Sequence, residues 1–390
     1  MINLTRLYLG ASQPADGLRY GTGHHRPFAS ARERRPVVVW NITRRCNLSC
    51  MHCYSDSCNQ NYDGELSFEE CKGVIDDLAD FGVPAVLLSG GEPMIRQDFF
   101  SLARYAAKRG LPFTLSTNGT LLSRPAVFSL RQMSCRYVGI SLDGIGKVHD
   151  KFRGRVGAFE RAVEGFKNCQ KIGQKSGLRL TLSRNNIDDL DNVLKFIEDY
   201  DIPRVCFYHL VFSGRGSNLQ LVEPERTRMA LDKILDRIKV WQSKGIEREV
   251  LTVDQPADGA YLYLRLQEED PSRAEDAFKL MQWNGGGANS SGVGIANIDS
   301  QGNVHPDQFW QTHTIGNVRD RRFSEIWTNS KDELLTGLRD RLPRLKGRCG
   351  SCRFQKVCGG GFRVRAAQVH NDPWATDPGC YLTDEETLAA

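Results

Sequence analysis

Residues 36–210 of this 390-residue chain alternate between short apolar segments rich in β-branched residues and longer segments with the period of amphipathic helices. The six short segments, read as strands, are residues 36–42, 85–89, 113–117, 137–142, 178–183 and 204–210. Such alternation predicts right-handed βαβ units, in which each helix covers a parallel sheet. Six units are fewer than the eight that close a barrel. We therefore expect an α/β fold, a partial (β/α)6 barrel, with its chemistry at the carboxyl ends of the strands.

The intervening segments carry helix start and stop signals. In residues 66–82, Ser67 is placed as an N-cap, Glu70 completes a capping box three residues later, and Gly82 ends the helix. Its apolar stripe consists of Val74, Leu78 and Phe81. Further helices are predicted at residues 98–109, 124–132, 157–173, 188–200 and 224–244.

Outside the alternating region the chain changes character. Residues 1–35 read as irregular, and residues 284–310 read as a Gly/Asn-rich loop followed by a hairpin whose turn is the sequence SQGN. The last 50 residues are dominated by loops and carry a second group of cysteines. The predicted parts are an N-terminal extension (1–35), the partial barrel (36–215), a helical linker region (216–283) and a small loop-rich C-terminal domain (284–390).

Composition and charge narrow the class of protein. The N-terminus lacks the layout of a signal peptide and the longest apolar runs are too short to span a bilayer, so we expect a cytoplasmic protein with no membrane span. The net charge of +5 is mild and diffuse, which argues against a nucleic-acid partner. It is compatible with a small polyanionic substrate.

Twelve cysteines in such a chain require an explanation, because disulfides are rare in a reducing compartment and clustered cysteines there indicate metal. One group consists of Cys46, Cys50 and Cys53, and the other of Cys349, Cys352, Cys358 and Cys380. The five scattered cysteines are expected to be inert thiols or small buried hydrophobes: Cys58, Cys71, Cys135, Cys169 and Cys206.

The first group, with the spacing C-x3-C-x2-C, directly follows the first predicted strand. Iron–sulfur clusters are normally held by four thiolates, so three neighbouring cysteines leave one iron open to a substrate or cofactor. The alternative is a zinc site completed by Cys58 or His52. The second group has four cysteines, which close a site, and its spacing alone leaves zinc and an iron–sulfur cluster equally open.

The first cysteine group, with His52 before its last cysteine, resembles the signature of the radical S-adenosylmethionine (SAM) enzymes. Further motifs match at the ends of successive predicted strands: SGGEP (89–93), STNGT (116–120), SLDG (141–144) and HDKFRG (149–154). The resemblance implies that SAM chelates the open iron of a three-cysteine [4Fe–4S] cluster and is cleaved, by one electron, to a 5′-deoxyadenosyl radical. It also implies SAM contacts from Gly90, Gly91, Glu92, Ser116, Asn118, Ser141 and Arg153.

The residue types suit these implied roles. Gly90 and Gly91 allow close approach of the backbone to a ligand. Glu92 offers a carboxylate to the SAM ammonium group, and Arg153 offers a guanidinium to its carboxylate. No catalytic side chain is assigned.

The C-terminal cysteines resemble those of SPASM or twitch domains, which implies one auxiliary [4Fe–4S] cluster, since four cysteines are present instead of the seven of the two-cluster version. Stretches such as NGGGANSSGVGIANID, GNVRDRRFSEIW and, near the N-terminus, LYLG and PADGLRYG resemble the radical SAM enzymes of the alternative haem and haem d1 pathways. The likeness is greatest to the didecarboxysirohaem deacetylases. It implies removal of acetate side chains from didecarboxysirohaem, which leaves methyl groups and gives iron-coproporphyrin III.

Three alternatives stay open at this point. They are a haem d1 enzyme that removes propionate side chains, a SPASM-type peptide maturase and a non-catalytic zinc-binding scaffold. The resemblance implies three partners: SAM, an anionic iron tetrapyrrole and a one-electron donor such as flavodoxin or ferredoxin.

Candidate substrate contacts are arginines and lysines for carboxylates and aromatic side chains for the ring. The basic candidates are Arg344, Lys346, Arg348, Arg363 and Arg365, and the aromatic ones are Trp283, Phe309 and Trp310. His209, His305 and His313 are candidates for axial ligands or proton donors. Taken singly, each of these residues fits a surface or core position better than a substrate contact.

Overall fold

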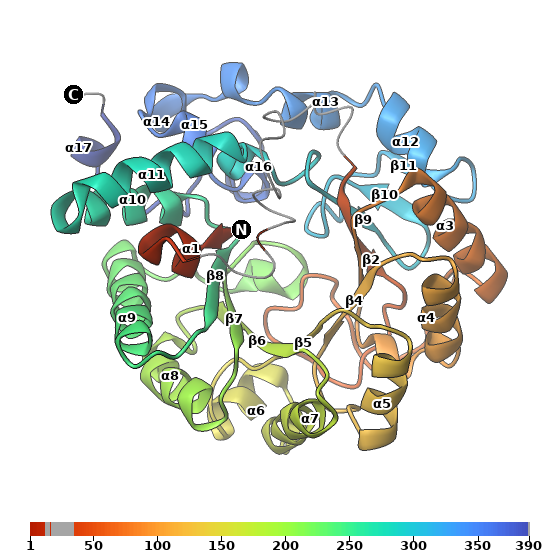
Figure 1. The fold of residues 1–390 in the computed structure, drawn as a ribbon. Coiled ribbons are helices and arrows are strands. Elements are labelled where there is room, and N and C mark those ends of the chain that lie inside the picture. Colours follow the sequence, from red (N-terminus) through yellow and green to blue (C-terminus); the bar gives the residue numbers. More distant parts are fainter. Residues whose placement is uncertain (12–15, 17–34, 389–390) are drawn as a thin grey trace.

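The computed structural model describes residues 1–11, 16 and 35–388, which form one curved sheet with helices around its outer face (Figure 1). The strand order is β1-β8-β7-β6-β5-β4-β3-β2-β9-β10-β11. The parallel strands of the barrel are β2 (Val37–Asn41), β3 (Val86–Ser89), β4 (Phe113–Thr117), β5 (Val138–Ser141), β6 (Ser176–Leu182), β7 (Arg204–His209) and β8 (Glu249–Val253).

The six predicted strands are confirmed as β2 to β7, in order and parallel. The covering helices are α3 (Phe68–Phe81), α4 (Phe99–Lys108), α5 (Arg124–Gln132), α7 (Ala158–Ile172), α8 (Leu190–Asp199) and α9 (Pro224–Ser243). The predicted capping box of α3 is present, with Glu70 N donating to Ser67 Oγ (3.3 Å) and Ser67 N to the Glu70 carboxylate (2.7 Å). Gly82 ends this helix in the left-handed conformation, at φ 73°.

Two predictions about the flanking segments are wrong. Residues 216–283 were expected to be helical, but they also contain β8, which pairs parallel to β7 and makes α9 the crossover helix of a further βαβ unit. Residues 2–9 were expected to be irregular, but β1 (Ile2–Asn3) pairs antiparallel to β8 and is followed by α1 (Leu4–Leu9). Strands β1 and β8 are short, and they are stabilised by pairing with each other and by the pairing of β8 with β7. The PADGLRYG stretch lies, apart from residue 16, outside the described residues.

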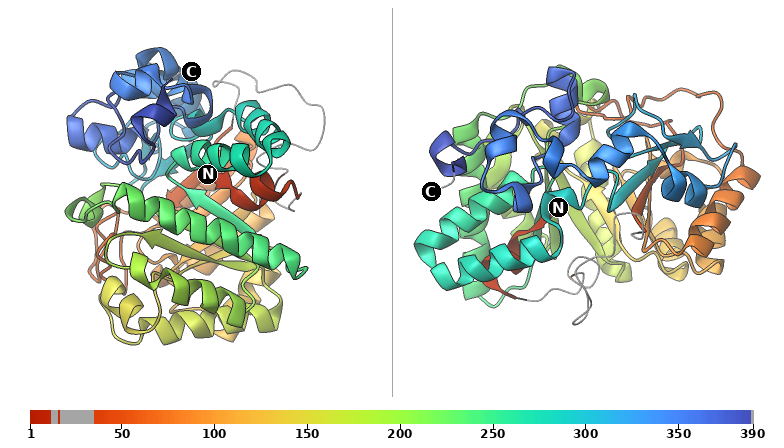
Figure 2. Two further views of the ribbon diagram at one scale, coloured as in Figure 1. Left: turned by 90° about the vertical axis from the view of Figure 1, so that its left-hand side faces the viewer. Right: turned by 90° about the horizontal axis from the view of Figure 1, so that it is seen from above.

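The C-terminal part continues the other edge of the sheet. The predicted hairpin is confirmed as β9 (Ile295–Ile298) and β10 (Asn303–His305), with β9 parallel to β2 and β11 (Gly316–Asn317) beyond β10. The remaining helices are α6 (Lys147–Arg153), α10 (Ala257–Glu269), α11 (Pro271–Trp283), α12 (Phe323–Asn329), α13 (Glu333–Arg339), α14 (Gly347–Ser351), α15 (Gln355–Cys358), α16 (Arg363–His370) and α17 (Asp384–Thr387). The helices after β11 run along one side of the curved sheet, from α12 beside α3 to α15 beside α10 and α11 (Figure 1 and Figure 2).

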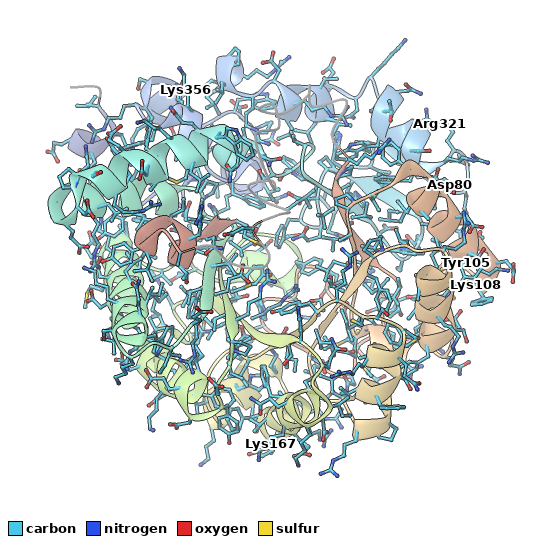
Figure 3. The ribbon with its side chains drawn as sticks, in the orientation of Figure 1. Asp80, Tyr105, Lys108, Lys167, Arg321 and Lys356 are labelled. Carbon is cyan, nitrogen blue, oxygen red and sulfur yellow. The ribbon has the colours of Figure 1, made fainter. Side chains whose placement is uncertain are left out.

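The outer surface is polar. Charged side chains such as Lys108, Lys167 and Lys356 are exposed on helices around the molecule (Figure 3). No helix in the described part of the chain has the length and apolar composition needed to cross a bilayer.

Candidate functional site

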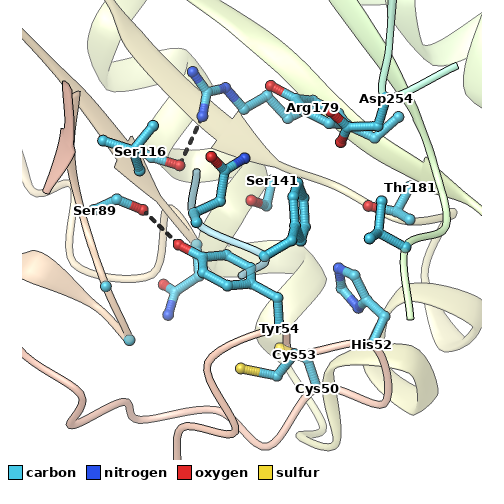
Figure 4. Close-up of a pocket in the computed structure, with 18 of the residues that line it drawn as sticks. Cys50, His52, Cys53, Tyr54, Ser89, Ser116, Ser141, Arg179, Thr181 and Asp254 are labelled. Atoms are coloured by element: carbon cyan, nitrogen blue, oxygen red, sulfur yellow. Dashed lines mark hydrogen bonds between the residues drawn. The ribbon is translucent and has the colours of Figure 1, made fainter. Parts of the chain in front are cut away.

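The carboxyl ends of strands β2 to β8 surround a cavity of about 180 Å³, part of which is shown in Figure 4. All three cysteines of the first group line it, from the loop after β2. Six of the seven predicted SAM contacts also line it: Gly90, Gly91, Ser116, Asn118, Ser141 and Arg153. The parallel arrangement of the strands thus brings together motifs that are far apart in the sequence.

Each thiol of the first group has at least one N–H donor. Cys46 Sγ accepts from Leu48 N (3.4 Å), Cys50 Sγ from Arg153 Nη1 (3.5 Å) and Cys53 Sγ from Ser57 N (3.3 Å). Burial raises the pKa of the Cys46 thiol to about 12, so that thiol is neutral at pH 7 unless a metal displaces its proton. Three thiols directed at one cavity, with N–H donors to their sulfurs, fit an iron–sulfur cluster.

Gly90 and Gly91 are required by the chain itself. A Cβ at Gly90 would lie 2.2 Å from the Thr43 carbonyl oxygen, and one at Gly91 would lie 2.3 Å from that of Arg45. The two glycines therefore let the loop after β3 pack directly on the backbone that leads to the cysteines. This contact, which the sequence analysis did not foresee, couples the two loops.

Glu92 is the one predicted SAM contact that does not line the cavity. Its carboxylate is fully buried and accepts hydrogen bonds from Thr117 Oγ1 (2.9 Å), Asn118 N (2.8 Å) and Met94 N (3.2 Å). Burial raises the pKa of Glu92 to about 7, against the opposing effect of these hydrogen bonds. In this arrangement Glu92 orders the turn that presents Asn118.

Arg153 is held by a buried partner. It forms an ion pair with Asp143, which is fully buried and also accepts from Thr181 N (2.8 Å). Burial alone would raise the pKa of Asp143, but the Arg153 guanidinium, the nearby His52 and the hydrogen bond from Thr181 N together outweigh it and lower the pKa below its usual value. The pair fixes Arg153 between the cysteine loop and the end of β5.

His52 and Cys58 are not arranged as zinc ligands. The His52 ring packs on Phe152, with 4.7 Å between ring centroids, and burial lowers its pKa to about 4. Cys58 Sγ lies 3.1 Å from Tyr62 Oη. Among the residues that the structure describes, no three His, Cys, Asp or Glu side chains meet closely enough to hold one metal ion. A zinc ion needs its ligands around a single point, whereas each iron of a cubane takes one thiolate. Cysteines that line one cavity but lie too far apart to share one ion therefore fit a cluster better than zinc.

The second cysteine group gathers around a second, smaller cavity. Cys349, Cys352, Cys358 and Cys380 all line it, although Cys380 is distant in sequence. Arg348 Nη2 donates to Cys380 Sγ (3.3 Å). The scattered cysteines behave as expected for small hydrophobes at four positions, since Cys71, Cys135, Cys169 and Cys206 are buried, whereas Cys58 is half-buried.

Comparison with known proteins identifies the family. Residues 40–197 match the radical SAM superfamily, and residues 291–353 match SPASM, an iron–sulfur cluster-binding domain. The chain is 48% identical to the Fe-coproporphyrin III synthase of Methanosarcina barkeri over 397 residues, covering 99% of this chain and 98% of that protein. This chain belongs to the radical SAM superfamily.

Two further radical SAM comparisons agree. The pre-heme d1 synthase of Dinoroseobacter shibae is 42% identical over 359 residues, which cover 91% of this chain and 88% of that protein. The solved structure of anSMEcpe with bound AdoMet superposes with a TM-score of 0.70 at 17% identity, covering 89% of this chain and 94% of that one, and so shows the same fold. Family membership implies a [4Fe–4S] cluster and SAM in the radical SAM core, and iron–sulfur chemistry in the SPASM domain.

Several residues of the radical SAM cavity were missed by the sequence analysis. They are Tyr54, Arg179, Thr181, Tyr208 and Asp254. For Arg179 and Thr181 a signal was present: they alternate along β6 with the buried Leu178, Leu180 and Leu182, so polar positions face the barrel interior. Asp254 follows β8, which was not recognised as a strand. It adopts φ 66°, an uncommon conformation for a residue with a side chain.

Most of the predicted substrate contacts near the SPASM cysteines form ion pairs, hydrogen bonds or ring contacts with other groups of the protein itself. Arg365 is fully buried in an ion pair with Asp377, and Arg363 Nη1 donates to the carbonyls of Pro373 and Ala375. Lys346 pairs with Asp372, Arg348 also bonds the Leu382 carbonyl, and Arg344 lies over the Trp374 ring. Trp310 is buried. Of the candidate aromatic and histidine residues, Phe309 and His209 line the radical SAM cavity.

A third cavity, of about 450 Å³, shares lining residues with each of the other two. It shares His209 and Leu210 with the radical SAM cavity, and Gln255 and Cys380 with the cavity of the SPASM cysteines.

Proposed function

We propose that this radical SAM protein removes the two acetate side chains of didecarboxysirohaem and forms iron-coproporphyrin III. The observation that carries the proposal is the 48% identity to an Fe-coproporphyrin III synthase along essentially the whole of both chains. A shared overall fold would support only the chemistry of the superfamily, whereas an identity of 48% over both whole chains also supports a shared substrate. The bordering third cavity supplies room for a large, flat substrate beside the SAM site.

We assign Cys46, Cys50 and Cys53 to the cluster that binds SAM, and Cys349, Cys352, Cys358 and Cys380 to one auxiliary [4Fe–4S] cluster. When bound, the first cluster and SAM together supply a 5′-deoxyadenosyl radical. Gly90, Gly91, Ser116, Asn118, Ser141 and Arg153 contact SAM directly in this proposal. Glu92 acts through the turn at Asn118, as its hydrogen bonds indicate.

The chain's own contribution is to hold the reactants and to exclude water. Leu210, Val211 and Phe309 give the cavity an apolar side, and the Phe309 ring packs edge-on against Tyr54 with 5.4 Å between centroids. Tyr54 Oη in turn donates to Asn41 Oδ1 (3.0 Å), so the end of β2 holds the Tyr54 ring in place. A dry, rigid wall suits a reactive radical, because it limits competing hydrogen donors.

The same proposal places the protein in the cytoplasm, with a one-electron donor such as flavodoxin or ferredoxin. The domain limits, at residues 35/36, 215/216 and 283/284, stay predictions. The sheet of the barrel continues past the second of these limits, to β8.

The direct test uses anaerobically reconstituted protein with SAM, a reductant and didecarboxysirohaem, and product mass spectrometry. Loss of two acetate groups is expected. Loss of propionate groups instead would indicate the haem d1 reaction, which the pre-heme d1 synthase similarity keeps as the second candidate. Unchanged tetrapyrrole alongside active SAM cleavage would reject both tetrapyrrole reactions and would favour the peptide maturase alternative. Protein that holds zinc and no iron would support the scaffold alternative.

A further inference from the structure

Two arginines line the radical SAM cavity, and they differ in their partners. Arg153 is neutralised by Asp143. Arg179, on β6, donates from Nη1 to Ser116 Oγ (2.8 Å), while its buried Nε has no hydrogen-bond partner. Among the described residues, no carboxylate lies within ion-pair distance of the Arg179 guanidinium. Within the part of the chain that the structure describes, the Arg179 guanidinium therefore has no ion-pair partner.

The place of Arg179 is built into the sheet. On the neighbouring strand β5, Arg179 is paired with Ser141, and its side chain extends over Gly139, where an added Cβ would lie 2.3 Å from Arg179 Nε and 2.7 Å from its Cζ. Any other residue at position 139 would displace the guanidinium. Ser116, on β4, fixes the far end through its hydroxyl (Figure 4). Three adjacent strands thus cooperate to direct one guanidinium into the cavity.

The polar groups around Arg179 do not supply the missing charge. Tyr208 and Tyr137 lie nearby, and burial raises the pKa of both phenols, so they are neutral at pH 7. Asp254 lies at the same end of the cavity (Figure 4), but it forms no ion pair with Arg179 and its buried Oδ2 has no hydrogen-bond partner. A guanidinium withdrawn from bulk water with a single neutral hydrogen bond is unfavourable unless a ligand completes it.

A carboxylate is the ligand that this geometry suits, because it accepts two parallel N–H donors from a guanidinium. SAM and the proposed tetrapyrrole both carry carboxylates, and position separates them. Cys50 and Cys53 lie at the opposite end of the cavity from Arg179 in Figure 4, and Arg153 donates to Cys50 Sγ. A SAM carboxylate that chelates the cluster is therefore on the Arg153 side.

We propose that Arg179, backed by Ser116 and accommodated by Gly139, binds a carboxylate side chain of the tetrapyrrole substrate and so sets its position over the SAM site. This assignment rests on the proposed function for the identity of the substrate. It makes Arg179 a binding residue for the tetrapyrrole, whose link to SAM is the indirect one through Ser116 Oγ, so its loss should weaken tetrapyrrole affinity far more than SAM affinity.

The test compares Arg179→Met and Arg179→Lys with the wild type as holoenzymes, by anaerobic titration with didecarboxysirohaem and, separately, with SAM. Loss of a charge-assisted pair is expected to raise the Kd for the tetrapyrrole about 10- to 100-fold in Arg179→Met and less in Arg179→Lys, with the Kd for SAM changed less than about 3-fold. Arg136→Met, at an exposed position two residues before β5, is the matched control and should leave both constants unchanged.

Methyl esterification of the substrate supplies a second measurement. The wild type should bind the methyl ester more weakly than the free acid, and Arg179→Met should lose at least about 10-fold of that discrimination, since the ester and the variant remove the same contact. Equal discrimination in both proteins, or a weakened affinity for SAM instead, would overturn the assignment. Wild-type turnover separates the two proposals. If the wild type converts didecarboxysirohaem but Arg179→Met binds it unchanged, only the role of Arg179 falls, whereas a wild type that binds no tetrapyrrole overturns both.

Discussion

The buried ion pair between Asp143 and Arg153 allows a quantitative test of how the SAM side of the cavity is held together. Asp143→Asn keeps the acceptor for Thr181 N but removes the negative charge, which leaves Arg153, only 7% exposed, with an uncompensated charge. Breaking one side of a buried pair costs about 3–5 kcal/mol. The entropy of unfolding is about 0.8 kcal/mol/K for 390 residues, so the expected fall in Tm is about 4–6 °C.

The assay is thermal unfolding of the holoenzyme, followed by circular dichroism at one scan rate, for Asp143→Asn, Arg153→Met and the double variant. The double variant removes both charges and should recover most of the loss, which gives a coupling of about 3 kcal/mol. Asp188→Asn is the matched control, because its ion pair with Arg226 is exposed and worth less than about 1 kcal/mol. A Tm for Asp143→Asn equal to that of the wild type, or additive losses in the double variant, would refute the reasoning.

Three further predictions follow from the geometry. Gly91→Ala should lower the iron content per chain, because the added Cβ would clash with the backbone of Arg45. Gly73→Ala is the control and should keep the wild-type iron content, because no atom lies within 4 Å of its Cβ. Burial raises the pKa of Asp254 to about 7, so the folded chain binds the extra proton and stability falls by about 1 kcal/mol as pH rises from 6 to 7. Asp254→Asn should remove this contribution, so that its urea unfolding midpoint falls less between pH 6 and pH 7 than that of the wild type. The same pH dependence in both proteins would contradict the prediction. Cys50→Ala and Cys380→Ala should each reduce iron from about 8 to about 4 per chain, but only Cys50→Ala should abolish SAM cleavage; loss of cleavage in both would contradict separate roles.

The barrel was predictable because its signals are local. Strand and helix periods, the Ser67 capping box and the motifs at the ends of β2 to β5 all lie within short windows of sequence. Strand β8 was missed, since a five-residue segment after a long helix has no period of its own to read, and its partners are β7 and the distant β1. The polar alternation in β6 was readable in principle, and it leads directly to Arg179.

The sequence alone determined the chemistry of this protein: three cysteines at cluster spacing, followed by ligand-binding motifs at successive strand ends, require only the order of elements along the chain. Tertiary structure decided what the individual side chains do. It turned Glu92 away from the cavity, paired Arg153 with Asp143, brought Cys380 to the other three C-terminal cysteines and left Arg179 without a counter-charge. These outcomes depend on strand register and on contacts between distant residues, and such contacts leave no pattern in a local stretch of sequence.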